Sequence, residues 1–207
     1  MMLKRIHPAA VVALVMAGLL FDAAAARAGK FNKALSAGDK APDFKNLAGT
    51  DDKPHGLADW KDAKLVVVVF TCNHCPIAGA YEDRIVALAN QYRERGVQFV
   101  AVSSSRLPSD DFAAMKKRAA EKKYPFPYLH DAAQQVGKSY GASVTPEVFV
   151  LKGDRTIGYL GTIDDNWNDE GAVGRAYLRD AIDALLAGKE PTRFETRPVG
   201  CGIQYED

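Results

Sequence analysis

The chain of 207 residues has few cysteines, only two tryptophans and almost no net charge. Its three cysteines are too few for a disulfide-stapled scaffold, and a structural zinc site usually needs four ligands in two paired half-sites. The net charge is +1, and it becomes −1 when the first 28 residues are left out. Such a balance argues against nucleic acid or an anionic membrane as a partner. There is also no internal repeat and no low-complexity linker.

The sequence has no hydrophobic run long enough to span a bilayer. Its longest apolar segment covers residues 9–21, whereas a transmembrane helix needs about 20 residues. A basic start and a small-x-small cleavage site flank this segment: Lys4, Arg5 and Ala26-Arg27-Ala28. We therefore expect residues 1–28 to be a signal peptide, with a mature chain from Gly29 in the periplasm or outside the cell and no stable membrane insertion. The alternative is a retained anchor that tethers the domain outside.

Residues 29–207 suffice for one domain, with a C-terminal tail from residue 189. The continuous apolar run 65–70 predicts a strand covered on both faces, and residues 97–102 predict a second one. Between them, Gly96 ends a predicted helix with one apolar stripe: Ile77, Tyr81, Ile85, Leu88 and Tyr92.

The second half of the chain predicts two helices, a hairpin and a last helix. Ser109 is expected to cap the first helix, and Asp131 with Gln134 to cap a short one that Gly141 ends. Residues 147–151 and 155–160 predict the hairpin. The last helix has an apolar side made of Val173, Leu178, Ile182 and Leu185. This order of elements predicts an α/β fold with a central mixed sheet and helices on both faces.

Cys72 and Cys75 directly follow the first predicted strand, in the string Thr71-Cys72-Asn73-His74-Cys75-Pro76. Two intervening residues allow the sulfurs to lie on one side of a turn, close enough to bond and separable on reduction. The spacing predicts a redox-active disulfide between Cys72 and Cys75, which needs no organic cofactor and no metal. Metal binding and an inert pair are the alternatives.

Three motifs in order resemble the thioredoxin fold: the Cys-x-x-C pair, Thr145-Pro146 before the hairpin, and Asp39-Lys40-Ala41-Pro42-Asp43-Phe44. The third is similar to the redoxin branch, which includes alkyl hydroperoxide reductase and thiol-specific antioxidant relatives and exported thiol-disulfide oxidoreductases. The resemblance covers about residues 37–190.

The resemblance implies that Cys72 is the nucleophile and Cys75 the resolving thiol. Helix capping leaves an alternative open, because Cys75 as the cap would place Pro76 at the favoured first position and bring Cys75 nearest the helix dipole, as in peroxiredoxins. The peroxiredoxin pattern is nevertheless incomplete, since Val67 stands at its proline position and Thr71 is one residue too far from Cys75. We favour Cys72.

Neighbouring residues are expected to tune or complete the site. His74, with Asn73 beside it, would stabilise a thiolate and make the pair more oxidising. By resemblance, Pro146 would be cis and would present the Thr145 backbone to an extended substrate segment. Thioredoxins usually have a tryptophan and a buried aspartate where this chain has Thr71 and Val66, so Glu147 is a candidate proton acceptor.

Cys201 in the tail could be a second resolving thiol, a partner-linking thiol or a bystander. His55 and His130 could complete a copper site with the two paired cysteines. The sequence thus predicts an exported thiol-disulfide oxidoreductase that exchanges electrons with protein thiols or disulfides and with an upstream donor or acceptor protein. The alternatives are a thiol peroxidase and a copper-binding or delivery module.

Overall fold

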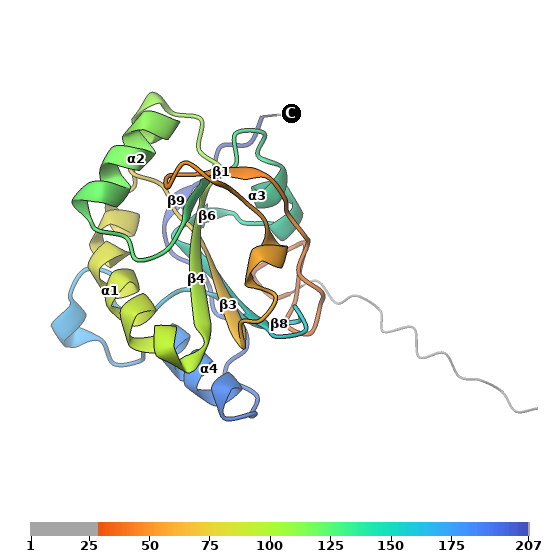
Figure 1. Ribbon diagram of the computed structural model, residues 1–207. Helices are drawn as coiled ribbons and strands as arrows, with labels where there is room; N and C mark the ends of the chain where they lie inside the picture. Colours follow the sequence, from red (N-terminus) through yellow and green to blue (C-terminus); the bar gives the residue numbers. More distant parts are fainter. Residues whose placement is uncertain (1–28, 207) are drawn as a thin grey trace, which may run out of the picture.

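The computed structural model describes residues 29–206, so the predicted signal peptide lies outside the described residues. Its central sheet has seven strands in the spatial order β2-β1-β5-β4-β3-β7-β8 (Figure 1). These strands are β1 (Leu47–Gly49), β2 (Pro54–His55), β3 (Leu65–Phe70), β4 (Val97–Ser103), β5 (Tyr128–His130), β7 (Glu147–Lys152) and β8 (Ile157–Gly161). A second sheet pairs β6 (Val144–Thr145) with β9 (Cys201–Gly202). The α-helices are α1 (Pro76–Tyr92), α2 (Phe112–Glu121), α3 (Gln135–Tyr140) and α4 (Tyr177–Leu186).

Strand pairing is parallel at the centre of the sheet and antiparallel toward both edges. Strand β4 lies parallel to β3 and to β5. Strand β7 runs antiparallel to β3, and β8 forms a hairpin with β7. Strand β1 is antiparallel to β5 and to β2. The predicted mixed sheet is confirmed, with crossover helices between parallel strands and a hairpin that adds antiparallel ones.

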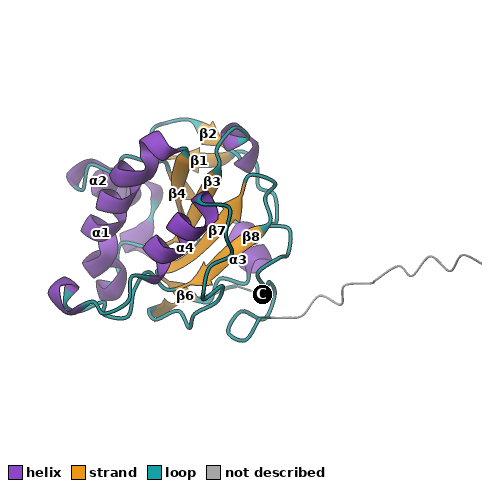
Figure 2. Cartoon of the chain, turned by 90° about the horizontal axis from the view of Figure 1, so that it is seen from below, coloured by secondary structure: helices purple, strands orange, loops and turns teal. Residues whose placement is uncertain are grey.

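Alternate residues of β3 face two separate hydrophobic cores. Leu65, Val67 and Val69 belong to the core that α1, α2 and α4 cover. Val66, Val68 and Phe70 belong to the other core, together with residues of α3 and of the segment before β3. Figure 2 shows these helices around the sheet. Burial on both faces explains the unbroken apolar run of β3, and the predicted helices on both faces are confirmed.

Helix α1 begins at Pro76, directly after the two cysteines. Cys75 is its N-cap with an extended backbone, and Pro76 occupies the first helical position, where its fixed φ and missing N–H are tolerated. The predicted apolar stripe is buried, apart from the partly buried Ile77. The helix ends at Tyr92, and one further 3₁₀ turn leads to Gly96, whose φ of 86° favours glycine.

Three predicted details of the second half were wrong. Asp111, not Ser109, caps α2 through the Ala114 N–H, because a 3₁₀ turn that begins at Pro108 delays the helix. Of the predicted capping pair of α3, the Asp131 side chain accepts the Gly137 N–H in the first turn at 2.9 Å, but Gln134, which stands at the cap, makes no side-chain capping bond there. Val173 lies before α4, not within it.

Several strands also differ from expectation, among them the short β1, β2, β6 and β9, whose bounds were not predicted. Strand β5 was not predicted, because three residues between a proline and an aspartate carry no readable alternation. Strand β8 begins at Ile157 instead of Arg155, since Arg155 has a φ of 67° and belongs to the hairpin turn.

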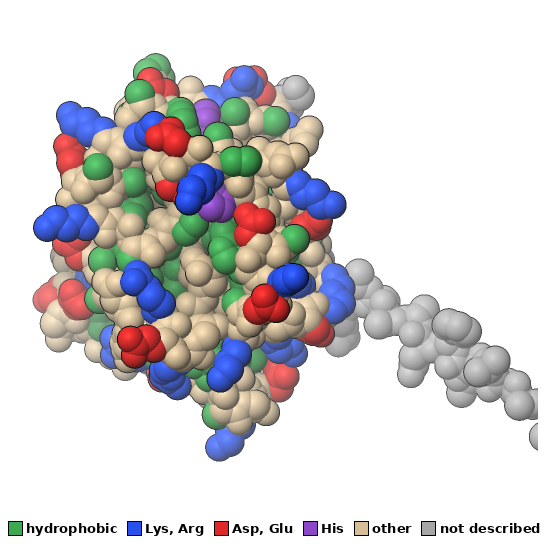
Figure 3. Space-filling model, in the orientation of Figure 1, with side chains coloured by type: hydrophobic (Ala, Val, Ile, Leu, Met, Phe, Trp, Pro, Cys, Tyr) green, Lys and Arg blue, Asp and Glu red, His purple; other side chains and the backbone are tan. Residues whose placement is uncertain are grey.

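The described residues contain no helix long and apolar enough to cross a membrane. On the face of the molecule in Figure 3, Lys and Arg side chains are interspersed with Asp and Glu. This mixture agrees with the nearly neutral sequence, and the face in view offers no basic stripe of the kind that follows a phosphate backbone.

Candidate active site

The two paired cysteines lie in the loop between β3 and α1 and contact the same residue, Thr145 at the end of β6. Cys72 Sγ lies 3.0 Å from Thr145 Oγ1, and Cys75 Sγ donates to Thr145 O at 3.0 Å. Both cysteines are buried, and the Thr145-Pro146 peptide bond is cis, as the resemblance implied. The structure thus brings Cys72, Cys75 and Thr145 together, while substrate binding by Thr145 remains a prediction.

A cavity of about 250 Å³ opens beside only one of the two sulfurs. Cys72, His74, Ser105 and Thr145 line one side of it, and tail residues 202–206 line the other. Cys75 is not part of this lining. A substrate that enters the cavity therefore meets Cys72 first, which agrees with the role of nucleophile.

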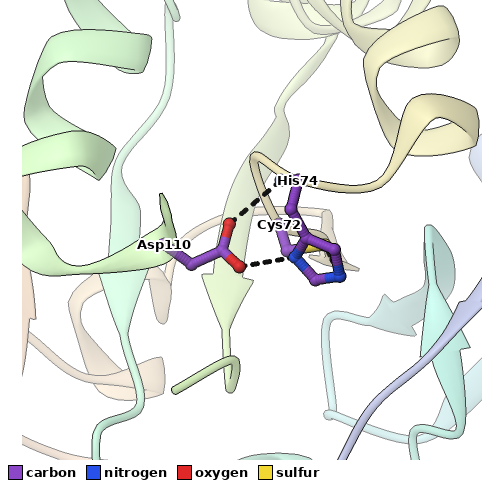
Figure 4. A group of neighbouring side chains, drawn as sticks. All are labelled: Cys72, His74 and Asp110. Atoms are coloured by element: carbon purple, nitrogen blue, oxygen red, sulfur yellow. Dashed lines mark hydrogen bonds and ion pairs between the residues drawn. The ribbon is translucent and has the colours of Figure 1, made fainter. Parts of the chain in front are cut away.

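His74 connects Cys72 to Asp110, a buried residue that sequence reasoning did not select (Figure 4). His74 Nδ1 lies 2.5 Å from Asp110 Oδ2, and His74 Nε2 lies 3.9 Å from Cys72 Sγ. Asp110 precedes α2, just beyond the end of β4. Because β3 and β4 are parallel neighbours, the segments that follow them meet at one sheet edge, and this topology was the signal that could have indicated Asp110.

The carboxylate of Asp110 accepts hydrogen bonds at both oxygens. Oδ1 accepts the backbone N–H groups of Asn73 at 2.6 Å and His74 at 3.1 Å, and Oδ2 accepts the Ser105 hydroxyl at 2.6 Å. An ionised carboxylate only accepts, so the His74 contact at Oδ2 requires a proton on Nδ1. In neutral His74 the lone pair then lies on Nε2, the nitrogen that faces Cys72. The arrangement suits transfer of the Cys72 proton to His74.

Asn73 anchors the same loop without touching a sulfur. Its side-chain nitrogen donates to Ser109 O at 3.1 Å, and its side-chain oxygen accepts from the Tyr128 hydroxyl at 3.3 Å. Any influence of Asn73 on the cysteines therefore acts through the position of the loop.

The Cys72 and Cys75 thiols shift each other's pKa in opposite directions. A hydrogen bond from Cys72 lowers the pKa of Cys75 to about 4 despite burial, and Cys201 and the Ala78 N–H also donate to Cys75. The bond to Cys75 and burial raise the pKa of Cys72. Fully reduced Cys75 donates to the Thr145 carbonyl, and the charge of deprotonated Cys75 is stabilised by the Cys72 and Cys201 thiols and by the Ala78 and Cys201 N–H groups.

Cys201 is the third thiol of the site, although it is far away in the sequence. It pairs with Thr145 in the β6–β9 ladder and packs against the cluster that contains Cys72 and Cys75. Burial, together with the interaction with Cys75, raises the pKa of the Cys201 thiol. The structure thus places Cys201 beside the paired cysteines, and its role stays a prediction.

The model of the Redoxin family matches residues 36–176, most of the chain and all of the region from the first strand to the start of α4. The chain belongs to the Redoxin family. Family membership gives it a thioredoxin-like redox function, in agreement with the fold and the thiols. No curated protein matches this redoxin.

Solved structures with the same fold include two similar proteins without assigned activity. An uncharacterized conserved protein of Geobacillus kaustophilus is 36% identical with a TM-score of 0.77, and the alignment covers 82% of this redoxin and 92% of that chain. A hypothetical protein of Sinorhizobium meliloti is 31% identical with a TM-score of 0.78, covering 84% and 97%. A Chlorobium tepidum protein described as a thiol:disulfide interchange protein DsbE is 26% identical with a TM-score of 0.57, covering 73% and 99%.

Glu147, the expected proton acceptor, is buried in this redoxin. Its Oε2 accepts from the Ser143 N–H at 2.8 Å and the Ser143 hydroxyl at 3.3 Å, and burial raises the pKa of the carboxyl group. None of the hydrogen bonds of Glu147 to described residues goes to a cysteine. His74 is therefore better placed to accept a proton from Cys72.

One group in residues 29–206 has the ligand types and spacing to hold a metal ion: Cys72, His74 and Asp110, whose ligand atoms lie within 4.8 Å of one another. A metal on Asp110 would have to compete with the hydrogen bonds that both of its oxygens already accept. Neither His55 nor His130 belongs to this group, so the structure does not form the copper site in which these histidines would join the two cysteines. His55 instead pairs with Asp51 and Asp59, and the His130 ring stacks on Phe112.

Proposed function

We propose that this redoxin is an exported thiol-disulfide oxidoreductase that exchanges electrons with protein thiols and disulfides through Cys72 and Cys75. The observation that carries the proposal is the position of the two sulfurs: Cys72 lines the cavity, and Cys75 lies outside that lining in the same buried cluster, with both sulfurs in contact with Thr145. A mixed disulfide formed at Cys72 would therefore have its resolving thiol already in place.

The proposed reaction begins when Cys72 loses its proton to His74. The Cys72 thiolate attacks one sulfur of a substrate disulfide, forming a mixed disulfide and releasing the first substrate thiolate. The Cys75 thiolate then attacks Cys72 Sγ, forming the Cys72–Cys75 disulfide and releasing the second substrate thiolate. The substrate gains two electrons, and an upstream donor protein returns the pair to the dithiol. The reverse sequence oxidises substrate thiols and needs an upstream acceptor.

The location outside the cytoplasm rests on the sequence of residues 1–28, with its basic start, apolar run and small-x-small site. Intact mass and N-terminal sequencing of the protein from fractionated cells test this part. Cleavage before Gly29 and release in a soluble extracytoplasmic fraction are expected. A full-length protein that stays with the membrane would indicate the retained anchor.

Substitution of each thiol tests the proposed chemistry. Cys75→Ser is expected to accumulate a mixed disulfide with a substrate protein, because the resolving thiolate is missing, and Cys72→Ser to lose exchange. Trapped complexes are identified by non-reducing gels and mass spectrometry, with Cys201→Ser as a matched control that keeps the pair. Trapping by Cys72→Ser instead of Cys75→Ser would contradict the assigned roles.

A thiol peroxidase is the second candidate, and one observation favours it. Cys75 caps α1 directly before Pro76, accepts the Ala78 N–H at 3.4 Å and has its pKa lowered to about 4. Peroxide consumption with a thiol donor tests this reading. Activity that survives in Cys72→Ser and disappears in Cys75→Ser would make Cys75 the peroxide-reducing thiol.

A further inference from the structure

The last residues of the described chain form a fixed wall of the active site. Ile203 N donates to Ser143 O at 3.0 Å, and the Tyr205 hydroxyl donates to Ala142 O at 2.7 Å. We call residues 200–206 the tail strap. It follows the loop that leads to Thr145 and closes one side of the cavity beside Cys72.

Gln134 holds the far end of the tail strap from the opposite side. Its side-chain nitrogen donates to Gln204 O at 2.7 Å and to Ser104 O at 2.8 Å, and its side-chain oxygen accepts the Glu206 N–H at 2.9 Å. Gln134 has a φ of 58°, which is unfavourable for a residue with a side chain. Its buried side chain thus serves the tail strap and not the cap of α3.

The near end of the tail strap approaches Thr145 so closely that residue 200 must be glycine. A Cβ atom on Gly200 would lie 2.0 Å from Thr145 O and 2.5 Å from the Thr145 carbonyl carbon. This approach puts Cys201 opposite Thr145, the residue that also contacts Cys72 and Cys75. The edge expected to receive an extended substrate segment is therefore occupied by the chain's own cysteine-bearing strand.

We propose that Cys201 is a third redox thiol, which exchanges with the Cys72–Cys75 disulfide to form a Cys75–Cys201 disulfide and free Cys72. The proposal rests on the proposed function, because it uses the disulfide formed there. Contact geometry carries it: Cys72 and Cys75 lie in one buried cluster against which Cys201 packs, and Thr145, which contacts both paired sulfurs at 3.0 Å, is the strand partner of Cys201.

The exchange needs no additional oxidant. The Cys201 thiolate attacks Cys75 Sγ, a sulfur–sulfur bond forms between Cys75 and Cys201, and the bond between Cys72 and Cys75 breaks. Cys72 leaves as the thiolate and takes up the proton that Cys201 has lost. Cys201 is oxidised and Cys72 is reduced, so the oxidation state of the protein does not change.

Formation of the first disulfide also prepares Cys201 to react. In the reduced protein, burial and the interaction with Cys75 raise the pKa of Cys201 to about 11. The charge on Cys75 is part of that cause, and it disappears when Cys75 enters a disulfide. Cys201 therefore ionises more readily in the oxidised protein, at the stage when it has a disulfide to attack.

The exchange would give the oxidised protein a free nucleophile in its cavity. With the oxidising equivalent stored between Cys75 and Cys201, Cys72 stays beside His74 and can engage a second thiol or disulfide. The tail strap would then act as an internal partner at the position where a protein substrate is expected to lie along Thr145.

Peptide mapping of the full chain tests the proposal. The protein is oxidised with glutathione disulfide, quenched with acid, labelled with N-ethylmaleimide and digested with trypsin. Residues 65–84 contain both paired cysteines in one tryptic peptide, so any disulfide link from this peptide to the one with Cys201 reports tail exchange. Oxidised wild type is expected to contain this linked pair with the label on Cys72. Its absence, with Cys201 fully labelled, would overturn the proposal.

Cysteine variants test whether Cys75 is the partner of Cys201 in the linked peptides. Cys72→Ser is expected to form the linked peptides within a monomer, whereas the matched Cys75→Ser control, with the same number of thiols, is expected to lose most of them. Gly200→Ala in the Cys72→Ser background should also lose the link, because the methyl group displaces the tail strap from Thr145. A Cys72→Ser protein that forms only disulfide-linked dimers would refute the proposal.

Cys201→Ser separates this inference from the proposed function. This variant should still form the Cys72–Cys75 disulfide and exchange with substrate. If wild type and Cys201→Ser both form the Cys72–Cys75 disulfide and exchange with substrate, but wild type shows no link to Cys201, only the proposed role of Cys201 is refuted. If neither forms Cys72–Cys75 or exchanges with substrate, the proposed function itself fails.

Discussion

Asp110→Asn should slow the reaction of Cys72, although residue 110 does not touch the sulfur. The Asn oxygen can still accept the two loop N–H groups, but its amide nitrogen replaces Oδ2 and donates toward His74 Nδ1. His74 must then accept at Nδ1 and carry its proton on Nε2. The nitrogen that faces Cys72 can no longer accept the thiol proton.

The size of the effect follows from the bond that is lost. A hydrogen bond to a charged group contributes about 1.5–3 kcal/mol, and about 1.4 kcal/mol corresponds to tenfold in rate, so the expected loss is roughly 10- to 150-fold. The analogous change in a Ser-His-Asp triad lowers kcat about 10⁴-fold. A smaller loss is expected here because a thiol ionises more easily than a serine hydroxyl.

The assay is alkylation of Cys72 by iodoacetamide between about pH 5 and 9, in a protein whose only cysteine is Cys72. Asp110→Asn should lower the rate near neutral pH and move the profile to higher pH, because His74 no longer accepts the Cys72 proton. Asp111→Asn is the matched control, because asparagine caps a helix as well as aspartate does and residue 111 caps α2. An unchanged rate and pH profile in folded Asp110→Asn protein would refute the role of His74.

Two further predictions concern the redox potential and the stability. His74→Gln should make the Cys72–Cys75 couple more reducing, because the imidazolium no longer faces the Cys72 thiolate. The expected change is about 30 mV for each unit by which the pKa of Cys72 rises. Equilibration with glutathione measures the potential, and an unchanged potential would exclude this tuning. Glu147→Gln should raise the urea midpoint at pH 7. Burial raises the pKa of Glu147 above 4.5, so the wild-type protein loses stability as pH rises from about 4.5 through the raised folded pKa. The advantage of the variant should vanish below about pH 4.5, and an equal midpoint at pH 7 would contradict the reasoning.

Local patterns in the sequence predicted the frame of the molecule. The unbroken run 65–70 indicated a strand buried on both faces, and two residues between Cys72 and Cys75 indicated a redox turn. Both signals depend on neighbours in the chain, where periodicity and spacing carry the information. The competition between Cys72 and Cys75 as helix cap was also decided locally, by the position of Pro76.

The missed features depend on contacts between distant segments. Asp110 looks like one of several acidic residues before a helix, and only the parallel pairing of β3 with β4 brings it to His74. Cys201 reaches Cys75 because the tail strap pairs with β6, for which no local pattern exists in a two-residue strand. Topology, not composition, places these two groups.

The departures from the thioredoxin pattern are consistent with a proton acceptor that has moved from the strand to the loop. Val66, at the position of the usual buried aspartate, is fully buried in an apolar core, where a carboxylate would have no partner for its charge. His74 lies in the loop and lines the cavity together with Cys72, and its partner Asp110 is held by three further donors. Because His74 lines the cavity, a proton that it accepts from Cys72 can pass to solvent there. Because His74 and Asp110 come from different segments, movement of the 71–75 loop relative to the turn before α2 would separate them and lower the reactivity of Cys72.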